Sequence, residues 1–306
     1  MTLDYSQLKN ILPEDCEFIG KNDLIFTGLQ SIYECKQGEI TWIKPGVRDE
    51  KSLLNSTQAS CIICSPDSFR LYKGERSSKL FLIHKDPKNV FFKIIQFIYK
   101  SGLKINSESF IHPTAIIDKE CVIGENVTIG EYCVIGACKI GNGVKISNHV
   151  KIYDCVSIGN YCSIREYCSI GGEGFGFIKD PEGKNEFIPH IGTVLIEDNV
   201  TIYPFSNVDR GTLGKTIIQS GTVIDHYVHV GHNTQTGKNN ILTAGTVLAG
   251  GSRIKDNCFI GVNTLVKEKA IIGSNVMTGM GSVVISDIPD GEIWVGSPAK
   301  YLRKNE

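Results

Sequence analysis

Residues 111–141 read IHPTAIIDKECVIGENVTIGEYCVIGACKIG, and isoleucine returns in them every six residues. After one five-residue step the same period continues to residue 170. Helices repeat every 3.6 residues and strands every two, so a strict six fits neither. This period is typical of a β-helix with three short strands per coil. The repeating residues are Ile111, Ile117, Ile123, Ile129, Ile135, Ile140, Ile146, Ile152, Ile158, Ile164 and Ile170.

The position four residues after each isoleucine is small or β-branched, as Ala115 and Val127 illustrate. One large and one small inward side chain per strand suit the interior of a narrow prism.

Cys61 and Cys64 form a CxxC pattern inside an apolar strand, where a structural role is favoured over metal or redox chemistry. At least five of the 11 cysteines occupy the small slot, which indicates small hydrophobic residues in a reducing compartment: Cys121, Cys133, Cys162, Cys168 and Cys258.

The length, charge and hydropathy of the chain limit the classes of function that it can have. The chain has 306 residues and a net charge of −1, which gives no support for nucleic-acid binding. It contains no apolar run long enough to span a bilayer, so no transmembrane helix is expected. The N-terminal MTLDYSQLKN lacks the apolar core of a signal peptide. We therefore expect a cytoplasmic protein.

The repeat divides the chain into parts. Residues 1–105 lack it and are expected to form a small α/β domain, which ends in an amphipathic helix after Asp86 and Pro87. A linker at 101–109 leads into a parallel β-helix that spans 106–287 within a mainly β chain. The tail is 288–306, and the period breaks in two loops: 171–190 and 209–216. Loops on a rigid scaffold commonly carry function.

The richest polar cluster is DHYVHVGHN at 225–233, where three histidines are spaced by two residues. Such spacing is typical of a zinc site, but His226 and His232 would lie on consecutive sides of a prism and could converge only across subunits. One histidine can instead act as a general base, with Asp225 as the candidate to hold its ring. From spacing alone, the cluster is equally well interpreted as a general-base site or as polar surface residues in a trimer interface.

The run from Ile188 to Asn233 resembles the UDP-3-O-acylglucosamine N-acyltransferases of lipid A biosynthesis. The GEGFGF stretch (172–177), the DRGTLG break (209–214) and the HN pair (232–233) occur in that family in the same order. GEITWIKPG and ASCIICSPD in the first domain are also similar. The resemblance implies a homotrimeric left-handed β-helix enzyme with no tightly bound cofactor or metal. The family acylates the amine of a nucleotide-linked amino sugar from an acyl carrier protein thioester.

The resemblance also assigns residues. It makes His232 the general base and Asp225 its partner. The remaining substrate-binding residues that it implies are Trp42, which would stack on uracil, and Phe175, Phe177, His190, His229 and Asn233. Backbone N–H groups near Gly250 and Gly251, one coil beyond His232, are expected to bind the oxyanion.

Two departures leave alternatives open. WIKPGVRD lacks the second aromatic that stacks on uracil in the family. The ending IWVGSPAKYLRK resembles acetyl-CoA-dependent hexapeptide transferases, which implies that Gly296 and Lys300 lie near the donor and that the donor is a CoA thioester. An acetyl-CoA-dependent sugar N- or O-acetyltransferase in surface-polysaccharide synthesis is therefore an alternative. A γ-carbonic-anhydrase-like zinc enzyme and a non-catalytic scaffold are two others.

Overall fold

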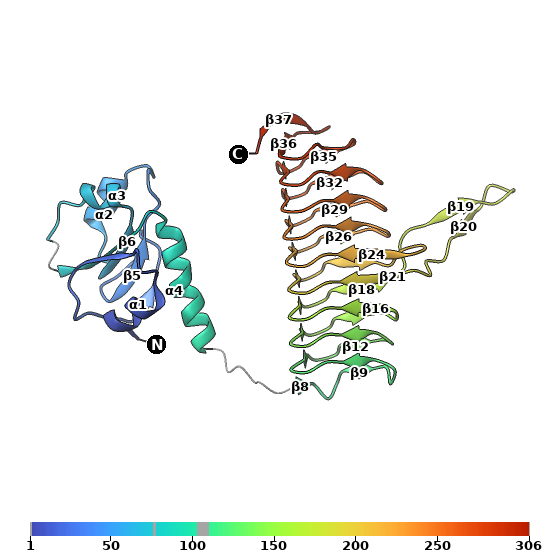
Figure 1. Cartoon of the computed structure of the whole chain (residues 1–306), viewed down its shortest axis with the longest axis horizontal. Coiled ribbons are helices and arrows are strands. Elements are labelled where there is room, and N and C mark those ends of the chain that lie inside the picture. The colour runs from blue at the N-terminus through green and yellow to red at the C-terminus, as the bar shows by residue number, and fades with distance from the viewer. Residues whose placement is uncertain (1, 76–77, 103–109, 306) are drawn as a thin grey trace. The chain divides into compact units, whose positions relative to one another are not determined.

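The computed structural model describes residues 2–75, 78–102 and 110–305. The chain divides into two compact units, Met1–Ile105 and Asn106–Glu306, which Figure 1 draws in blue-green and in green to red. Of the linker expected at 101–109, residues 103–109 lie outside the described residues. None of the described helices is long and apolar enough to cross a membrane.

The first unit is built on a five-stranded sheet with the order β2-β7-β6-β5-β4, in which only β2 runs antiparallel to its neighbour. The strands are β2 Glu17–Gly20, β4 Gly28–Leu29, β5 Glu39–Trp42, β6 Cys61–Cys64 and β7 Leu80–Ile83, and a small pair is formed by β1 Leu3–Asp4 and β3 Ile25–Phe26. The helices are α1 Tyr5–Ile11, α2 Glu50–Ser56, α3 Pro66–Leu71 and α4 Pro87–Gly102.

Sequence patterns explain this unit well. All four residues of β6 are buried, because β6 is central and both sheet faces are covered. Cys61 and Cys64 are free thiols in that core, and burial raises the pKa of Cys64 to about 12. The Asp86 carboxylate caps α4 by accepting the Asn89 N–H at 3.1 Å. The expected α/β arrangement of strands and pre-solenoid helix is therefore present.

The second unit winds through three parallel sheets in turn, visible as the stack of flat coils in Figure 1. Sheet 1 contains β8 Phe110–Ile111, β11 Thr128–Ile129, β14 Lys145–Ile146, β17 Ser163–Ile164, β22 Thr201–Ile202, β25 Val223–Ile224, β28 Ile241–Leu242, β31 Phe259–Ile260, β34 Met277–Thr278, β36 Glu292–Val295 and β37 Lys300–Lys304. Sheet 2 contains β9 Ile116–Ile117, β12 Val134–Ile135, β15 Lys151–Ile152, β18 Ser169–Gly172, β23 Asn207–Asp209, β26 His229–Val230, β29 Val247–Leu248, β32 Leu265–Val266 and β35 Val283–Val284. Sheet 3 contains β10 Val122–Ile123, β13 Lys139–Ile140, β16 Val156–Ile158, β21 Thr193–Ile196, β24 Lys215–Ile218, β27 Gln235–Thr236, β30 Arg253–Ile254 and β33 Ile271–Ile272.

The register confirms the six-residue period. Ile224 pairs with Leu242, the position that three full repeats require. Ile129 pairs with Ile146 and not with the residue after it, because the five-residue step shortens that coil. The repeating isoleucines from Ile129 onward are buried and stack into one continuous core, into which the small-slot cysteines also point. Burial of this apolar column, at about 25 cal/mol per Å², is the main stabilising contribution in the unit.

Both breaks in the period occur at the corner between sheets 2 and 3, in consecutive coils. The first projects from the stack as a hairpin of β19 Phe177–Lys179 and β20 Asn185–Phe187, drawn yellow-green in Figure 1. The second follows β23 and rejoins sheet 3 at β24. Arg210 ties the two together: its N–H donates to Gly172 O at 2.9 Å and its Nε to Gly171 O at 2.6 Å. The corner is therefore a fixed platform for the loops.

The tail covers the last coil. β36 continues sheet 1 in parallel with β34, and β37 folds back antiparallel onto β36. A parallel solenoid must protect its terminal strand edges from pairing with other chains. The antiparallel β37 does so for sheet 1.

Candidate active site

Three polar side chains and one glycine lie at the corner between sheets 2 and 3, one in each of four consecutive coils. His190 lies just before β21, and Asp209 ends β23. His232 follows β26, and Gly250 follows β29 in the next coil. Because each coil returns to the same corner, residues that are far apart in the sequence become neighbours.

The His232 ring is held in one tautomer by Asn233. The Asn233 Oδ1 accepts the Thr212 N–H at 3.0 Å, and its Nδ2 donates to Leu213 O at 2.5 Å, which fixes the orientation of the amide. Since Oδ1 is an acceptor, the His232 Nδ1, 3.1 Å away, carries the proton. The other nitrogen, Nε2, then presents a free lone pair, as a general base requires.

Gly250 lies against the reactive edge of that ring. A Cβ on Gly250 would lie 2.5 Å from His232 Nε2 and 2.7 Å from Cε1. Its N–H has no hydrogen-bond partner among the described residues. By contrast, the Gly251 N–H donates to His232 O at 2.8 Å and is not available to a substrate. Of the two expected oxyanion donors, only Gly250 offers a free N–H.

His190 packs against His232 with ring centroids 4.9 Å apart and planes at 79°. The ring is 2% exposed, and its Nδ1 lies 2.9 Å from Ile188 O, so Nδ1 carries the proton. Its Nε2 is buried and unpaired among the described residues. Gly174 and Gly176 fold over this ring, because a Cβ there would approach it to 3.1 and 2.8 Å. The glycines of GEGFGF therefore serve close packing on a histidine.

Asp209 and His229 form a second polar pair next to His232. The Asp209 Oδ1 accepts the Asn207 Nδ2–H at 3.0 Å, and its Oδ2 lies 3.9 Å from His229 Nε2. Burial raises the pKa of the Asp209 carboxyl, while protonated His229 and the Asn207 hydrogen bond act in the opposite direction. The Asn207 amide also contacts His229 Nδ1, at 2.9 Å.

The projecting hairpin carries the expected aromatic residues. Phe175 is 85% exposed and packs on Phe177, with ring centroids 5.0 Å apart. Phe177 contacts Phe187, which in turn stacks on His190 at 6.4 Å. A row of rings thus leads from the hairpin to the histidines.

The predicted pairing of Asp225 with His232 is wrong. Asp225 Oδ1 contacts His226, at 2.8 Å from its N–H and 2.7 Å from its Nδ1, and Oδ2 accepts the Ala244 N–H at 3.1 Å. The cause is the coil geometry: Asp225 and His226 lie between sheets 1 and 2, one corner before His232. The same geometry separates His226 from His232 within the chain, as expected. Among the residues that the structure describes, no group of three or more His, Cys, Asp or Glu side chains could hold a metal ion.

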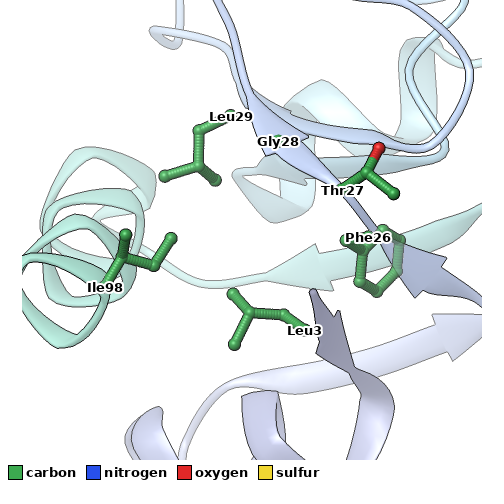
Figure 2. A pocket seen from close by; sticks show the side chains of 6 residues that line it. All are labelled: Leu3, Phe26, Thr27, Gly28, Leu29 and Ile98. Carbon is green, nitrogen blue, oxygen red and sulfur yellow. The ribbon is translucent and has the colours of Figure 1, made fainter. Parts of the chain in front are cut away.

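Trp42 lies in the first unit, at the end of β5. It is half-buried against Phe91 and borders a cavity of about 160 Å³. Tyr33, which is 72% exposed, borders the same cavity. A separate cavity of about 230 Å³, shown in Figure 2, has no charged lining residue: it is lined by Leu3, Phe26, Thr27, Gly28, Leu29 and Ile98.

The tail places Gly296 beside sheet 2, whereas Lys300 lies in sheet 1, paired with Val295. The Val283 N–H donates to Gly296 O at 3.0 Å, and the Ala299 N–H donates to Val283 O at 2.8 Å. Lys300 begins β37 and is exposed. Val283, the partner of Gly296, lies three coils beyond His229 on the strand column that carries it.

The structure brings together five of the residues expected at the site: His190, His229, His232, Asn233 and Gly250. The sequence patterns gave no prediction for Asp209, which lies in the DRG break, or for Thr212. The signal for both was the position of that break, one coil before the histidine cluster.

A family model described as bacterial transferase hexapeptide (six repeats) matches residues 102–137 and 137–172. The UDP-3-O-acylglucosamine N-acyltransferase of Methylococcus capsulatus is 36% identical over 135 residues, which cover 44% of this chain and 38% of that protein. A protein with the same description from Caulobacter sp. is also 36% identical, over 44% and 39%. The chain thus matches about two fifths of the length of these curated relatives.

Solved structures extend the similarity. UDP-N-acetylglucosamine O-acyltransferase from Moraxella catarrhalis is 30% identical, with a TM-score of 0.57 over 64% of this chain and 74% of that one. The chain belongs to the hexapeptide-repeat acyltransferases. The UDP-N-acetylglucosamine acyltransferase of Campylobacter jejuni is 27% identical, with a TM-score of 0.58. The match covers 63% of this chain and 74% of the Campylobacter chain. Membership of the hexapeptide-repeat acyltransferases identifies the solenoid as a left-handed β-helix and confirms the expected fold.

Proposed function

We propose that this protein transfers an acyl group from a thioester to the amine of a nucleotide-linked amino sugar, in lipid A or surface-polysaccharide synthesis. The observation that carries the proposal is the pairing of His232 and Gly250. A basic nitrogen with a free lone pair lies beside an unpaired backbone N–H. Acyl transfer needs both: a proton acceptor for the nucleophile and a donor for the oxyanion.

The steps follow from these atoms. The amine nitrogen attacks the thioester carbonyl carbon and forms the C–N bond, while His232 Nε2 accepts a proton from that nitrogen. The carbonyl oxygen becomes an oxyanion and is bound by the Gly250 N–H. The tetrahedral intermediate then expels the thiolate, which takes the proton from His232. Asn233 keeps the ring oriented throughout, in the role first expected of Asp225.

The outward row of sheet 2 supports a donor path towards the tail. The residues in register beyond His229 are Val247, Leu265 and Val283, which are all apolar. Leu265 is 44% exposed although the next residue is buried, so the row faces outward. Three strand spacings correspond to about 14 Å. We therefore place the thioester and its acyl group on this row and the amino sugar on the polar side of His229.

The first unit is proposed to bind the nucleotide base. Tyr33 and Trp42 border one cavity, and two aromatic side chains can bind a base by stacking. Titration with UDP and dTDP while Trp42 fluorescence is followed tests this assignment. Tyr33→Ala should weaken binding of the preferred nucleotide by about 5- to 100-fold, in line with about 1–3 kcal/mol for base stacking.

A homotrimer is the proposed assembly. Exposed rings stack along the corner between sheets 1 and 2, with centroids about 5 Å apart, and give the unit an extended aromatic edge: Tyr132, His149, Tyr167, Phe205 and Tyr227. Exposed apolar surfaces of this kind commonly mark interfaces. Light scattering of the purified chain should give three times the monomer mass, and a monomer would contradict the assignment.

Turnover on a panel of acceptors and donors tests the reaction. UDP- and dTDP-linked amino sugars are each offered acetyl-CoA, a short 3-hydroxyacyl-CoA and a long 3-hydroxyacyl carrier-protein thioester. Product containing a new amide, detected by mass spectrometry and lost by orders of magnitude in His232→Ala, is the expected result. Near wild-type turnover by that variant would remove His232 from the mechanism.

A further inference from the structure

The corner contains proton acceptors that the reaction scheme does not use. Asp209 Oδ2 has no hydrogen bond among the described residues, since His229 Nε2 lies 3.9 Å away. The residue as a whole is 9% exposed. His190 Nε2 is also unpaired within the described part of the chain, and its tautomer makes it an acceptor. His190 Nε2 is buried, and a buried polar atom without a partner costs about 1–3 kcal/mol, so a molecule that donates a hydrogen bond to it is favoured.

We propose that Asp209, assisted by His190, binds the nitrogen of the acceptor substrate as an ammonium group and so selects amines over hydroxyls. This inference rests on the proposed function and names the discriminating residues. A nitrogen bound there carries up to three N–H donors, enough to donate to both Asp209 Oδ2 and His190 Nε2. A hydroxyl offers one donor and no positive charge, and it would leave one of these two acceptors unpaired.

The electrostatics of the cluster favour a cation. The groups facing Asp209 are His229, His232 and His190. Each histidine, when it is protonated, would stabilise the Asp209 carboxylate. Burial nevertheless raises the pKa of Asp209, which shows that these neighbours leave the carboxylate undercompensated. An ammonium group from the substrate would supply the missing charge through a charge-assisted hydrogen bond, which is stronger than one between neutral groups.

The position of Asp209 suits a binding rather than a basic role. Asp209 ends β23 and follows Val208, which pairs with Val230 of β26, so it lies one strand from the turn that carries His232. It can hold the nitrogen next to His232. The bound ammonium group first releases one proton to bulk water, and the neutral amine then attacks while His232 accepts the second proton. Asp209 is therefore a substrate-binding residue, and the proton released during attack goes to His232.

The test measures acceptor binding without a donor. Matched UDP- and dTDP-linked sugars, which differ only in an amine or a hydroxyl at C2, C3 or C4, are titrated into the full chain by calorimetry. The wild type should bind at least one amine at least tenfold more tightly than its hydroxyl counterpart. Asp209→Asn should weaken that amine by about 10- to 100-fold and leave the hydroxyl unchanged. His190→Leu should act in the same direction.

A pH series and a matched variant separate binding from structure. Amine affinity of the wild type should fall as pH rises and the ammonium group is lost, and this dependence should flatten in Asp209→Asn. Asp256→Asn, an Asp whose Oδ1 accepts the Lys238 N–H at another corner, should bind as the wild type does. Equal affinities for amine and hydroxyl, or equal losses of both in Asp209→Asn, would overturn the inference. Selective amine binding without turnover of any donor would instead uphold it and reject the proposed reaction.

Discussion

Replacing Gly250 by alanine tests the geometry on which the mechanism depends. The new Cβ would lie 2.5 Å from His232 Nε2, 2.7 Å from Cε1 and 3.0 Å from Cδ2. Carbon contacts are normally about 3.5–4.0 Å, so the ring must retreat by about 1 Å. The backbone itself accepts alanine, since Gly250 does not have the left-handed φ of its neighbour Gly251.

A displacement of this size should reduce kcat substantially. A misplacement of about 1 Å can cost about 100-fold in rate, which corresponds to about 2.7 kcal/mol of transition-state stabilisation. The ring has little room to recover its place, because Asn233 and Thr212 hold its Nδ1 and His190 packs against its face. The assay is steady-state turnover of the acceptor–donor pair found by the panel, together with a thermal melt.

Gly141→Ala is the matched control. Its Cβ would lie 2.7 Å from the carbonyl carbon of Gly159 in the next coil, far from any histidine of the site. That variant should lower Tm and leave kcat of the folded protein unchanged, whereas Gly250→Ala should lower kcat with little change in Tm. A Gly250→Ala enzyme with kcat within about twofold of the wild type would refute the placement of the reaction beside His232 Nε2.

Other consequences concern the neighbours of His232 and the core. Asn233→Asp keeps an acceptor for the ring but adds a negative charge that stabilises the protonated imidazole, so the acidic limb of the pH–rate profile should move to higher pH. Asp209→Asn removes a carboxyl whose pKa is raised by burial in the folded state. The folded state binds the Asp209 carboxyl proton more tightly than the unfolded state does, so the ionised carboxylate destabilises the fold once pH rises through its folded pKa. Asp209→Asn should therefore melt at a higher temperature than the wild type at neutral pH. The difference in Tm should shrink towards acidic pH. Ile202→Ala, at a fully buried position, should lower the free energy of unfolding by about 2–5 kcal/mol in denaturant titrations, whereas the same change at Ile111, 42% exposed at the end of the stack, should cost well under half of that.

The fold could be predicted from the sequence because every coil repeats the same six-residue period. An isoleucine that returns every six residues must face the same interior in every strand, and the observed pairing of Ile224 with Leu242 follows from that period alone. The breaks at 171–190 and 209–216 were equally visible, since they interrupt a strict period. Cys133 and Cys168 could be interpreted as packing residues for the same reason, and both are buried.

The site was less readable, because its contacts depend on which corner a residue occupies. Asp225 stands shortly before His232 in the sequence, which made it an attractive partner. In the coil, β26 separates the corner that holds Asp225 from the corner that holds His232, and Asp225 reaches His226 instead. The true partner of His232 is Asn233, and its role depends on an amide orientation fixed by Thr212 and Leu213 across the second break.

The two breaks explain why the chemistry is confined to one corner. A regular coil presents the same small set of side chains at every turn, so it cannot by itself surround a substrate. The short break after β23 lengthens that coil, sets Asn207 opposite His229 and leaves Asp209 beside the turn that leads to His232. The longer break one coil earlier brings back His190 to cover the other side. Because the solenoid cores above and below remain in register, these insertions add functional groups without loosening the scaffold. The outward row of sheet 2 changes at His229 from the polar Asn207 to the apolar Val247, which puts a polar surface on one side of the proposed base and an apolar surface on the other.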